Sequence, residues 1–325
     1  MKYLIVGFGS IGRRHFRNLL SLGERDIYFC RTGRSTLEDD ELDGYLVEHD
    51  LDAALAHDPD GVIIANPTAY HLDAAIPAAQ KGCHILVEKP ISHTMERVEE
   101  FRQAVKENGS RVLVGFQFRF HPNLLQIRDL LERDTVGAPL AVRSHWGEYL
   151  PGWHPWEDYR KSYSARKDLG GGALLTLCHN FDYLRWLFGD GQVKASLLGQ
   201  SGELGIDVED TAEVLLEFQG GLIANVHLNF IQRPASHTLE VIGTRGTIRW
   251  DYYQNRVDLV SYDDSGQSDE KSYHCQEGFD RNELFMQEMS HFIDVVEDGV
   301  RPICNLQDGI KVLEIALAAG TRGVR

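Results

Sequence analysis

The feature that most constrains the fold of this chain is a glycine pattern that directly follows a short apolar run at its start. The run is Lys2–Val6, and the next residues, Gly7-Phe8-Gly9-Ser10-Ile11-Gly12, match G-x-G-x-x-G. A helical periodicity follows over Ile11–Leu22. A glycine pattern between a buried strand and a helix is typical of the turn that binds the diphosphate of a dinucleotide.

Each residue of this turn has an expected part in holding the diphosphate. Gly7 permits the tight turn, Gly9 lets the backbone approach the phosphates, and Gly12 lets the helix pack on the strand. Ser10 and Ile11 begin the helix, where unpaired N–H groups and a partial positive charge favour an anion. A purely structural glycine turn is the alternative.

The first 120 residues alternate between apolar runs and helical segments, a pattern that indicates a parallel sheet with helices on both faces. Gly23, Gly82 and Gly109 stand where helices are expected to end. The expected strands are Lys2–Val6, Asp26–Cys30, Gly61–Ala65, His84–Val87 and Arg111–Gln117, and the expected helices are Ile11–Leu22, Thr68–Lys81 and Met95–Asn108. Residues 1–120 are therefore predicted to form a dinucleotide-binding Rossmann domain.

The pattern changes after residue 120. A glycine triplet, Gly170 to Gly172, is expected to begin a helix that runs to Leu187, and the polar stretch Ser261–Ser272 is expected to be an exposed loop. The other expected helices are Asn123–Arg133, Asn282–Glu297 and Leu306–Ala319, and the expected strands are Leu140–Glu148, Thr211–Phe218, Leu222–Phe230, His237–Ile242 and Thr247–Tyr252. The prediction is an α/β protein whose second domain, residues 121–305, is α+β with a large, mostly antiparallel open sheet. The last segment, 306–325, is expected to be mainly helical.

The end of the second strand bears on the choice of cofactor. An acidic residue usually follows this strand in NAD-binding sites, where it binds the ribose 2′-hydroxyl. Here Arg31, Thr32 and Arg34 follow Cys30. Arginine can bind a 2′-phosphate through two hydrogen bonds, so the sequence favours NADP over NAD. The alternative is that both arginines are solvated loop charges.

Charge and cysteine usage narrow the class of protein. A net charge of −16 argues against a nucleic-acid or anionic-membrane partner. Five scattered cysteines, with no C-x-x-C pair, fit free thiols in a reducing compartment. No apolar run approaches the roughly 20 residues of a membrane helix, and the histidines lack metal-ligand spacing. We therefore expect a cytoplasmic protein without a metal site.

Several segments are similar to one known family. The opening GFGSIGRRH, the segment Ala65–His71 (ANPTAYH) and Val87-Glu88-Lys89-Pro90 together resemble the Gfo/Idh/MocA oxidoreductases, and the likeness continues through GFQFRFHP, GGGALLTLCHNFDYLRWLFG and IGTRGTI. The resemblance implies hydride transfer between nicotinamide C4 and a carbon that bears a hydroxyl or carbonyl group, on a sugar, sugar nucleotide or cyclitol. It also implies that the helix in residues 306–325 returns to the Rossmann domain, and that a homodimer or homotetramer forms through the C-terminal sheet. The residues that it adds to the cofactor site are Asn66, Pro67, Thr68, His71, Glu88 and Lys89.

Two residues are candidates for proton transfer. Lys89 follows a Rossmann strand, at the edge where open α/β sheets bind ligands. His179 occupies the position of the family's catalytic histidine, although Leu175 and Thr176 stand where many members carry an acidic residue. Asp182, three residues further on, is the alternative partner for an imidazolium. A histidine that serves only the core or a helix cap is the other interpretation.

The substrate residues are expected around a loop that is rich in aromatic and basic side chains. Trp153 and Tyr163 lie in this loop, and Arg119, Asn180 and Asp182 complete the candidate set. Aromatic rings stack on sugars or bases and basic groups bind phosphate, which favours a nucleotide-activated or phosphorylated sugar. A packing loop or subunit contact is equally compatible. The alternative functions are a glycosidase with retained NAD and a non-catalytic cofactor-sensing regulator.

Overall fold

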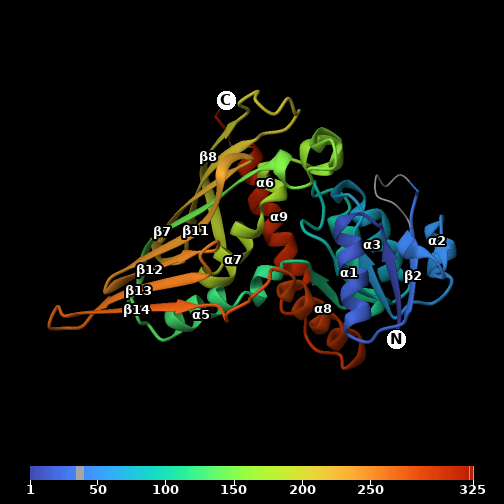
Figure 1. Cartoon of the computed structure of the whole chain (residues 1–325), viewed down its shortest axis with the longest axis horizontal. Coiled ribbons are helices and arrows are strands. Elements are labelled where there is room, and N and C mark those ends of the chain that lie inside the picture. The colour runs from blue at the N-terminus through green and yellow to red at the C-terminus, as the bar shows by residue number, and fades with distance from the viewer. Residues whose placement is uncertain (34–39, 322, 325) are drawn as a thin grey trace. The chain divides into compact units, whose positions relative to one another are not determined.

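The computed structural model describes residues 1–33 and 40–321 and the backbone of 323–324, and these divide into two compact units (Figure 1). Unit 1 comprises Met1–Gln117, Asp168–Gly170 and Asp280–Leu313. Unit 2 comprises Phe118–Lys167, Gly171–Phe279 and Glu314–Arg325. The expected boundaries, at residues 120 and 305, differ from this division because Asp280–Leu313 belong to unit 1.

Unit 1 contains a parallel sheet whose strands, within the described residues, follow the order β3-β2-β1-β4-β5-β6. The strands are β1 (Lys2–Val6), β2 (Asp26–Cys30), β3 (Val47–Glu48), β4 (Gly61–Ile64), β5 (His84–Val87) and β6 (Val112–Val114). Because their residues are almost continuously buried, as in a sheet covered on both faces, apolar runs marked them in the sequence. The predicted Rossmann sheet is confirmed, with β4 and β6 shorter than expected.

Helices pack in two groups against this sheet. On one side α1 (Ser10–Ser21) contacts α8 (Asn282–Glu297), where Asn282 Nδ2 donates to Asn18 Oδ1 over 3.0 Å. The other group contains α2 (Leu51–Leu55), α3 (His71–Gln80) and α4 (Val98–Asn108). The Phe292 ring of α8 lies 6.3 Å from the ring of Tyr3 in β1. This contact shows how α8, far along the chain, belongs to the core of unit 1.

Unit 2 is built on a sheet that is mostly antiparallel. Among the described residues it has nine strands in the order β14-β13-β12-β11-β7-β10-β9-β8-β15, and the β10–β7 and β15–β8 pairs are parallel. The strands are β7 (Pro139–Tyr149), β8 (Gly191–Gly199), β9 (Thr211–Phe218), β10 (Ile223–Asn229), β11 (Ile231–Gly243), β12 (Gly246–Asp251), β13 (Arg256–Tyr262), β14 (Ser268–His274) and β15 (Gly323–Val324). The predicted large, mostly antiparallel sheet is confirmed.

Helices cover one face of this sheet. Figure 1 shows α5 (Pro122–Glu132), α6 (Ala173–Thr176) and α7 (His179–Phe188) along the same side, and each contacts strands of the sheet. Buried and more exposed residues alternate along β9 and β10, as expected for a sheet with one covered face. The last helix, α9, spans Leu306–Thr321.

Two sequence predictions about unit 2 are wrong. Ser261–Ser272 is not a loop, because β13 and β14 form a hairpin in which Tyr262 pairs with Ser268. Nearly every residue of β14 is exposed, so this edge strand is held by backbone hydrogen bonds and has no apolar periodicity to reveal it. The helix after the glycine triplet is broken, since α6 ends at Thr176 and α7 begins at His179.

No helix in the described part of the chain is both long and apolar enough to span a lipid bilayer.

Candidate functional site

The turn between β1 and α1 has the close contacts that only glycine allows. Gly7 has a φ of 93°, and a Cβ there would lie 2.7 Å from the backbone nitrogen of Asn66. A Cβ on Gly12 would collide with the carbonyl oxygen of Gly7. A Cβ on Gly9, in contrast, would meet no protein atom within 4 Å. Gly7 and Gly12 are thus required by the fold, whereas the space beside Gly9 is open to a ligand.

Helix α1 presents its amino end at this turn. Gly9 caps the helix without a side-chain hydrogen bond, and no acidic residue occurs in the first turn. The N–H groups of Ser10 and Ile11 are therefore not matched by a side-chain acceptor at the cap, and the helix dipole favours an anion. The turn follows β1, which pairs with both β2 and β4 at the centre of the sheet. These residues fit the diphosphate of a dinucleotide at the usual position in such a sheet.

The segment after β4 is tied to the segment after β5 by His71. Its Nδ1 lies 2.8 Å from the carbonyl oxygen of Pro90, and its Nε2 lies 3.0 Å from that of Asn66. Burial lowers the pKa of His71, while its hydrogen bonds to the Pro90 and Asn66 carbonyl groups act in the opposite direction. Because both ring nitrogens face backbone carbonyls, His71 can serve the cofactor site by holding these loops, which also carry Pro67 and Thr68.

Lys89 lies two residues after the end of β5, at the same edge of the sheet as the glycine turn. The preceding Glu88 is buried, and its Oε1 lies 2.8 Å from Nε2 of His15 in α1. Burial by itself would raise the pKa of Glu88, but the hydrogen bond from His15 and the charges of His15 and Lys89 outweigh it and lower the pKa. Glu88 is therefore a carboxylate that is bound inside unit 1, next to a half-buried Lys89.

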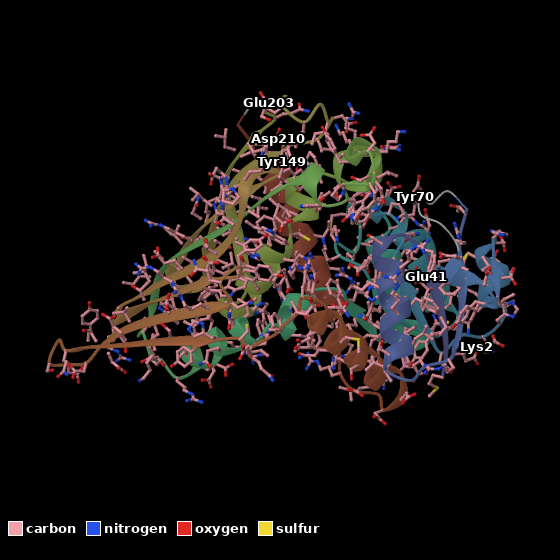
Figure 2. All side chains as sticks on the ribbon, in the orientation of Figure 1. Lys2, Glu41, Tyr70, Tyr149, Glu203 and Asp210 are labelled. Atoms are coloured by element: carbon pink, nitrogen blue, oxygen red, sulfur yellow. The ribbon has the colours of Figure 1, made fainter. Side chains whose placement is uncertain are left out.

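The end of β2 carries residues that the sequence suggested for binding a 2′-phosphate. Arg31 is largely buried and its N–H donates to the carbonyl oxygen of Glu48, whereas Thr32 is exposed. Arg34 lies outside the described residues. After the undescribed residues, Glu41 (labelled in Figure 2) contacts α1: its carboxylate accepts hydrogen bonds from Arg13 over 2.8 Å and from Arg17 over 2.7 Å.

The candidate histidine of unit 2 is the first residue of α7. His179 is buried, and its ring centroid lies 5.0 Å from that of Phe118 and 5.6 Å from that of Trp146. The break between α6 and α7 puts Thr176 at the end of the preceding helix, so Thr176 and His179 do not belong to one continuous helix. His179 is thus positioned by an aromatic cluster.

The carboxylate of Asp182 is held by Arg119. Arg119 Nε lies 3.0 Å from Oδ2 and Nη2 lies 2.7 Å from Oδ1, and the side chains are 3% and 1% exposed. This bidentate ion pair joins two residues that the sequence suggested as substrate ligands. Asp182 thus has Arg119 as an ion-pair partner on the same helix that begins with His179.

Asn180 belongs to a buried hydrogen-bond chain. Its Nδ2 donates to Ser144 Oγ over 2.8 Å, and Ser144 is bonded in turn to the Tyr183 hydroxyl over 2.5 Å. The Tyr183 hydroxyl also lies 3.3 Å from Nε2 of His237. Sequence reasoning missed Ser144 and His237, since a polar residue on a strand gives no sign of what it faces.

The aromatic and basic loop is only partly packed. The Trp153 ring lies 5.5 Å from that of Phe230, while Trp156 is 68% exposed. Tyr163 is half-buried in a short 3₁₀ turn, Tyr163–Ala165. Arg160 is bound to Asp158 over 2.9 Å, so its charge is partly balanced.

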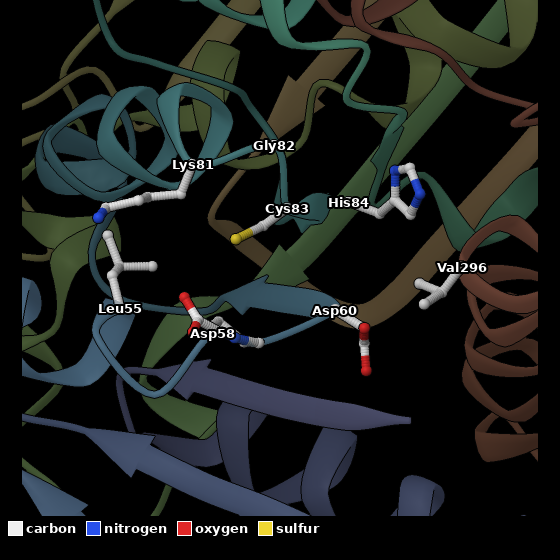
Figure 3. A pocket seen from close by; sticks show the side chains of 9 residues that line it. Leu55, Asp58, Asp60, Lys81, Gly82, Cys83, His84 and Val296 are labelled. Carbon is white, nitrogen blue, oxygen red and sulfur yellow. The ribbon is translucent and has the colours of Figure 1, made fainter.

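A pocket of about 300 Å³ lies elsewhere in unit 1 (Figure 3). It is lined by residues before β4 and at the start of β5, including Asp58, Asp60, Cys83 and His84. These are the amino ends of the strands, whereas open α/β sheets bind their ligands at the carboxyl ends. The pocket is therefore not the candidate cofactor site.

Comparison with known proteins supports this interpretation of the two units. Residues 1–116 match the model of an oxidoreductase family with an NAD-binding Rossmann fold, and residues 124–249 match the GFO/IDH/MocA C-terminal domain. The chain is 28% identical to scyllo-inositol 2-dehydrogenase (NAD(+)) of Bacillus subtilis, over 97% of this chain and 92% of the relative.

Solved structures share the fold of the whole chain. A levoglucosan dehydrogenase in complex with NADH has a TM-score of 0.86 and 20% identity, over 99% of this chain and 98% of the other. UDP-N-acetylglucosamine 3-dehydrogenase from Acidithiobacillus ferrooxidans has a TM-score of 0.80 and 18% identity, over 99% and 97%. With the family models covering both parts of the sequence, this chain belongs to the Gfo/Idh/MocA oxidoreductases and has their NAD-binding Rossmann fold.

Proposed function

We propose that this protein transfers a hydride between a nicotinamide dinucleotide and a hydroxyl- or carbonyl-bearing carbon of a sugar, cyclitol or sugar nucleotide. The observation that carries the proposal lies within unit 1. The open turn at Gly9 follows β1, and Lys89 follows β5, so both stand at the carboxyl edge of one parallel sheet. A diphosphate-binding turn and a proton-carrying amine at one edge are what such a reaction requires.

The bound nicotinamide supplies the hydride acceptor or donor. When an alcohol is oxidised, its O–H proton leaves with the C–H hydride, and we assign this proton to Nζ of Lys89. In the reverse direction Lys89 returns the proton to the carbonyl oxygen. His179 is the second candidate for proton transfer in this proposal, with the aromatic cluster around Phe118 holding its ring.

Replacing Lys89 tests the assignment. Lys89→Ala should lower kcat by about 10²- to 10⁴-fold, the usual contribution of a general acid or base, while the Kd of the cofactor stays close to that of the wild type. Lys81→Ala is the matched control, because this exposed lysine lies before the opposite end of β5. Near-normal turnover by the Lys89 variant would rule out this residue as the proton carrier.

The substrate class is proposed from the loop that carries Trp153 and Tyr163. The relatives named above act on inositol and UDP-N-acetylglucosamine, which are both polyhydroxylated rings. The exposed Trp156 and the basic side chains Lys161 and Arg166 support a phosphorylated or nucleotide-activated sugar. Turnover of cyclitols and nucleotide sugars, followed by the absorbance of the reduced cofactor, distinguishes the two classes.

The choice of NADP over NAD rests on Arg31 and Arg34. Calorimetric titration should give a lower Kd for NADP⁺ than for NAD⁺, and this preference should disappear in the Arg31→Ala, Arg34→Ala double variant because the 2′-phosphate loses its cationic partners. Tighter binding of NAD⁺ would show that the 2′-phosphate pocket is absent, as the NADH in the levoglucosan dehydrogenase structure would lead one to expect.

A further inference from the structure

Three elements of unit 1 bring a histidine and two carboxylates together in its interior. His15 lies on α1, Glu88 directly follows β5, and Glu288 lies on α8. A ring nitrogen of His15 and one carboxylate oxygen from each glutamate all lie within 4.8 Å of one another. The Nε2 of His15 is hydrogen-bonded to Glu88 Oε1 over 2.8 Å. Glu88 therefore has a partner in this cluster.

Glu288 differs from Glu88 in having no such partner. Its side chain is fully buried, and neither carboxylate oxygen has a hydrogen-bond partner in the described structure. An ionised carboxylate without a partner is very costly in a protein interior, and such a group becomes neutral instead. We propose that Glu288 is held in the folded protein as a neutral carboxylic acid, so that the cluster of His15, Glu88 and Glu288 carries one carboxylate charge, that of Glu88, rather than two.

The surrounding groups agree with this assignment. The elements packed against α8 carry titratable or charged residues of their own. These are Arg14 and His15 on α1 and Glu88 and Lys89 after β5, while α8 itself also carries His291 and Asp294. Arg14 lies over the Phe285 ring, 4.4 Å from its centroid, and His15 is bonded to Glu88. Burial raises the pKa of Glu288 well above its ordinary value, and the nearby charge of Glu88 adds to this effect.

The neutral state matters for the proposed reaction, on which this part of the inference rests. A second negative charge would stabilise the protonated form of a neighbouring lysine and so oppose its action as a base. Glu288 does not touch the reacting atoms. Glu288→Gln has the same shape as the neutral acid and no charge, so it should keep kcat and KM within about twofold of the wild type at neutral pH.

The unfolding equilibrium tests the protonation state without any turnover. A folded-state pKa above the unfolded value means that stability is lost as pH rises from the ordinary carboxyl pKa towards the raised one. The unfolding constant of the wild type should therefore rise up to tenfold per pH unit relative to that of Glu288→Gln. Urea unfolding from about pH 5 to pH 8 measures this ratio, with Glu297→Gln, an exposed carboxylate at the end of the same helix, as the matched control.

Two further measurements complete the test. Infrared difference spectra of the wild type should show the carbonyl band of a protonated carboxyl at neutral pH, and Glu288→Gln should lack it. The proposal would be overturned if the ratio of the wild-type and Glu288→Gln unfolding constants did not change with pH, or if this band were absent. It would also be overturned by one equivalent of a divalent metal in the purified protein that is lost in Glu288→Gln, because the three side chains would then be ligands.

The outcomes also separate this inference from the proposed function. If Lys89→Ala keeps its activity while the unfolding ratio and the infrared band behave as expected, the proposed function fails and the neutral Glu288 stands. If Glu288→Gln folds but loses more than about tenfold in kcat, the ionised form is required and the inference fails.

Discussion

Arg119 and Asp182, two candidate substrate residues, are partners of each other inside unit 2. Both are polar residues in segments that resemble a substrate site, so the sequence suggested that they bind substrate. The structure joins them in a buried bidentate pair, although 63 positions separate them in the chain. The pair ties Arg119 to α7, the helix that begins at His179.

Breaking this pair should destabilise unit 2 strongly. Asp182→Asn leaves the Arg119 guanidinium buried without its counter-charge, and we expect a loss of about 3–5 kcal/mol in the free energy of unfolding. The matched control is the exposed pair Arg128–Glu132, where Glu132→Gln should cost at most about 0.5 kcal/mol. Urea unfolding measures both, and equal small losses would show that the buried pair is not important for stability.

In the turn between β1 and α1, some glycines are required by the fold, and another leaves space for a ligand. Gly12 is required by the close approach of α1 to Gly7, whereas Gly9 faces open space and has no positive φ. Gly12 is therefore constrained by packing within the protein, and Gly9 by the space that a ligand needs. Substitution by alanine can distinguish these two constraints.

Alanine at the two positions should give different results. Gly12→Ala forces α1 away from Gly7, so both the melting temperature and the affinity for the cofactor should fall. Gly9→Ala should leave the melting temperature within about 2 °C of the wild type but weaken cofactor binding at least tenfold, because its methyl group takes the space of the diphosphate. Thermal unfolding and calorimetry measure the two effects, and unchanged binding by Gly9→Ala would place the diphosphate elsewhere.

The elements that the sequence predicted well are those with a strong apolar pattern. The bounds of β1, β2, β5, β9 and α8 were predicted without error, because each buries a continuous run or a regular face. The edge strands β14 and β3 were missed, since edge strands are held by backbone bonds that leave no apolar signal. The inner strand β13 was also missed, although it buries Val257 and Leu259 in alternation. The break between α6 and α7 also escaped prediction, as no glycine or proline marks it.

At the scale of the whole molecule, contiguous motifs predicted the fold and family, but clusters from distant segments could not be predicted. The glycine turn and Lys89 each lie in one short motif. The cluster of His15, Glu88 and Glu288 needs three elements to meet, and nothing in the spacing of these residues indicates it. The strand order of the sheet in unit 2 likewise could not be predicted, because it joins strands that are far apart in the sequence.

One face of this sheet carries exposed apolar side chains, and we expect it to form the homo-oligomer. Leu197 on β8, Leu215 on β9 and Ile223 on β10 are 56%, 41% and 55% exposed. Their strands are neighbours, and the pairing of Leu197 with Glu213 and of Ile223 with Glu217 puts all three on the side opposite the buried positions of β9. Exposed apolar side chains gathered on one face of a sheet, with polar residues between them, are a feature of protein–protein interfaces.

Charged substitutions on this face test the assembly. The wild type should sediment as two or four copies of the 36.7 kDa chain, and Leu215→Lys with Ile223→Lys should shift it to the monomer because burying an unpaired ammonium at an interface is costly. Leu46→Lys, at an exposed apolar residue of unit 1, is the matched control and should leave the mass unchanged. Circular dichroism checks that each variant is folded. If the folded double variant remains an oligomer, another surface must hold the copies together, since two lysines at the centre of an apolar contact would not be tolerated.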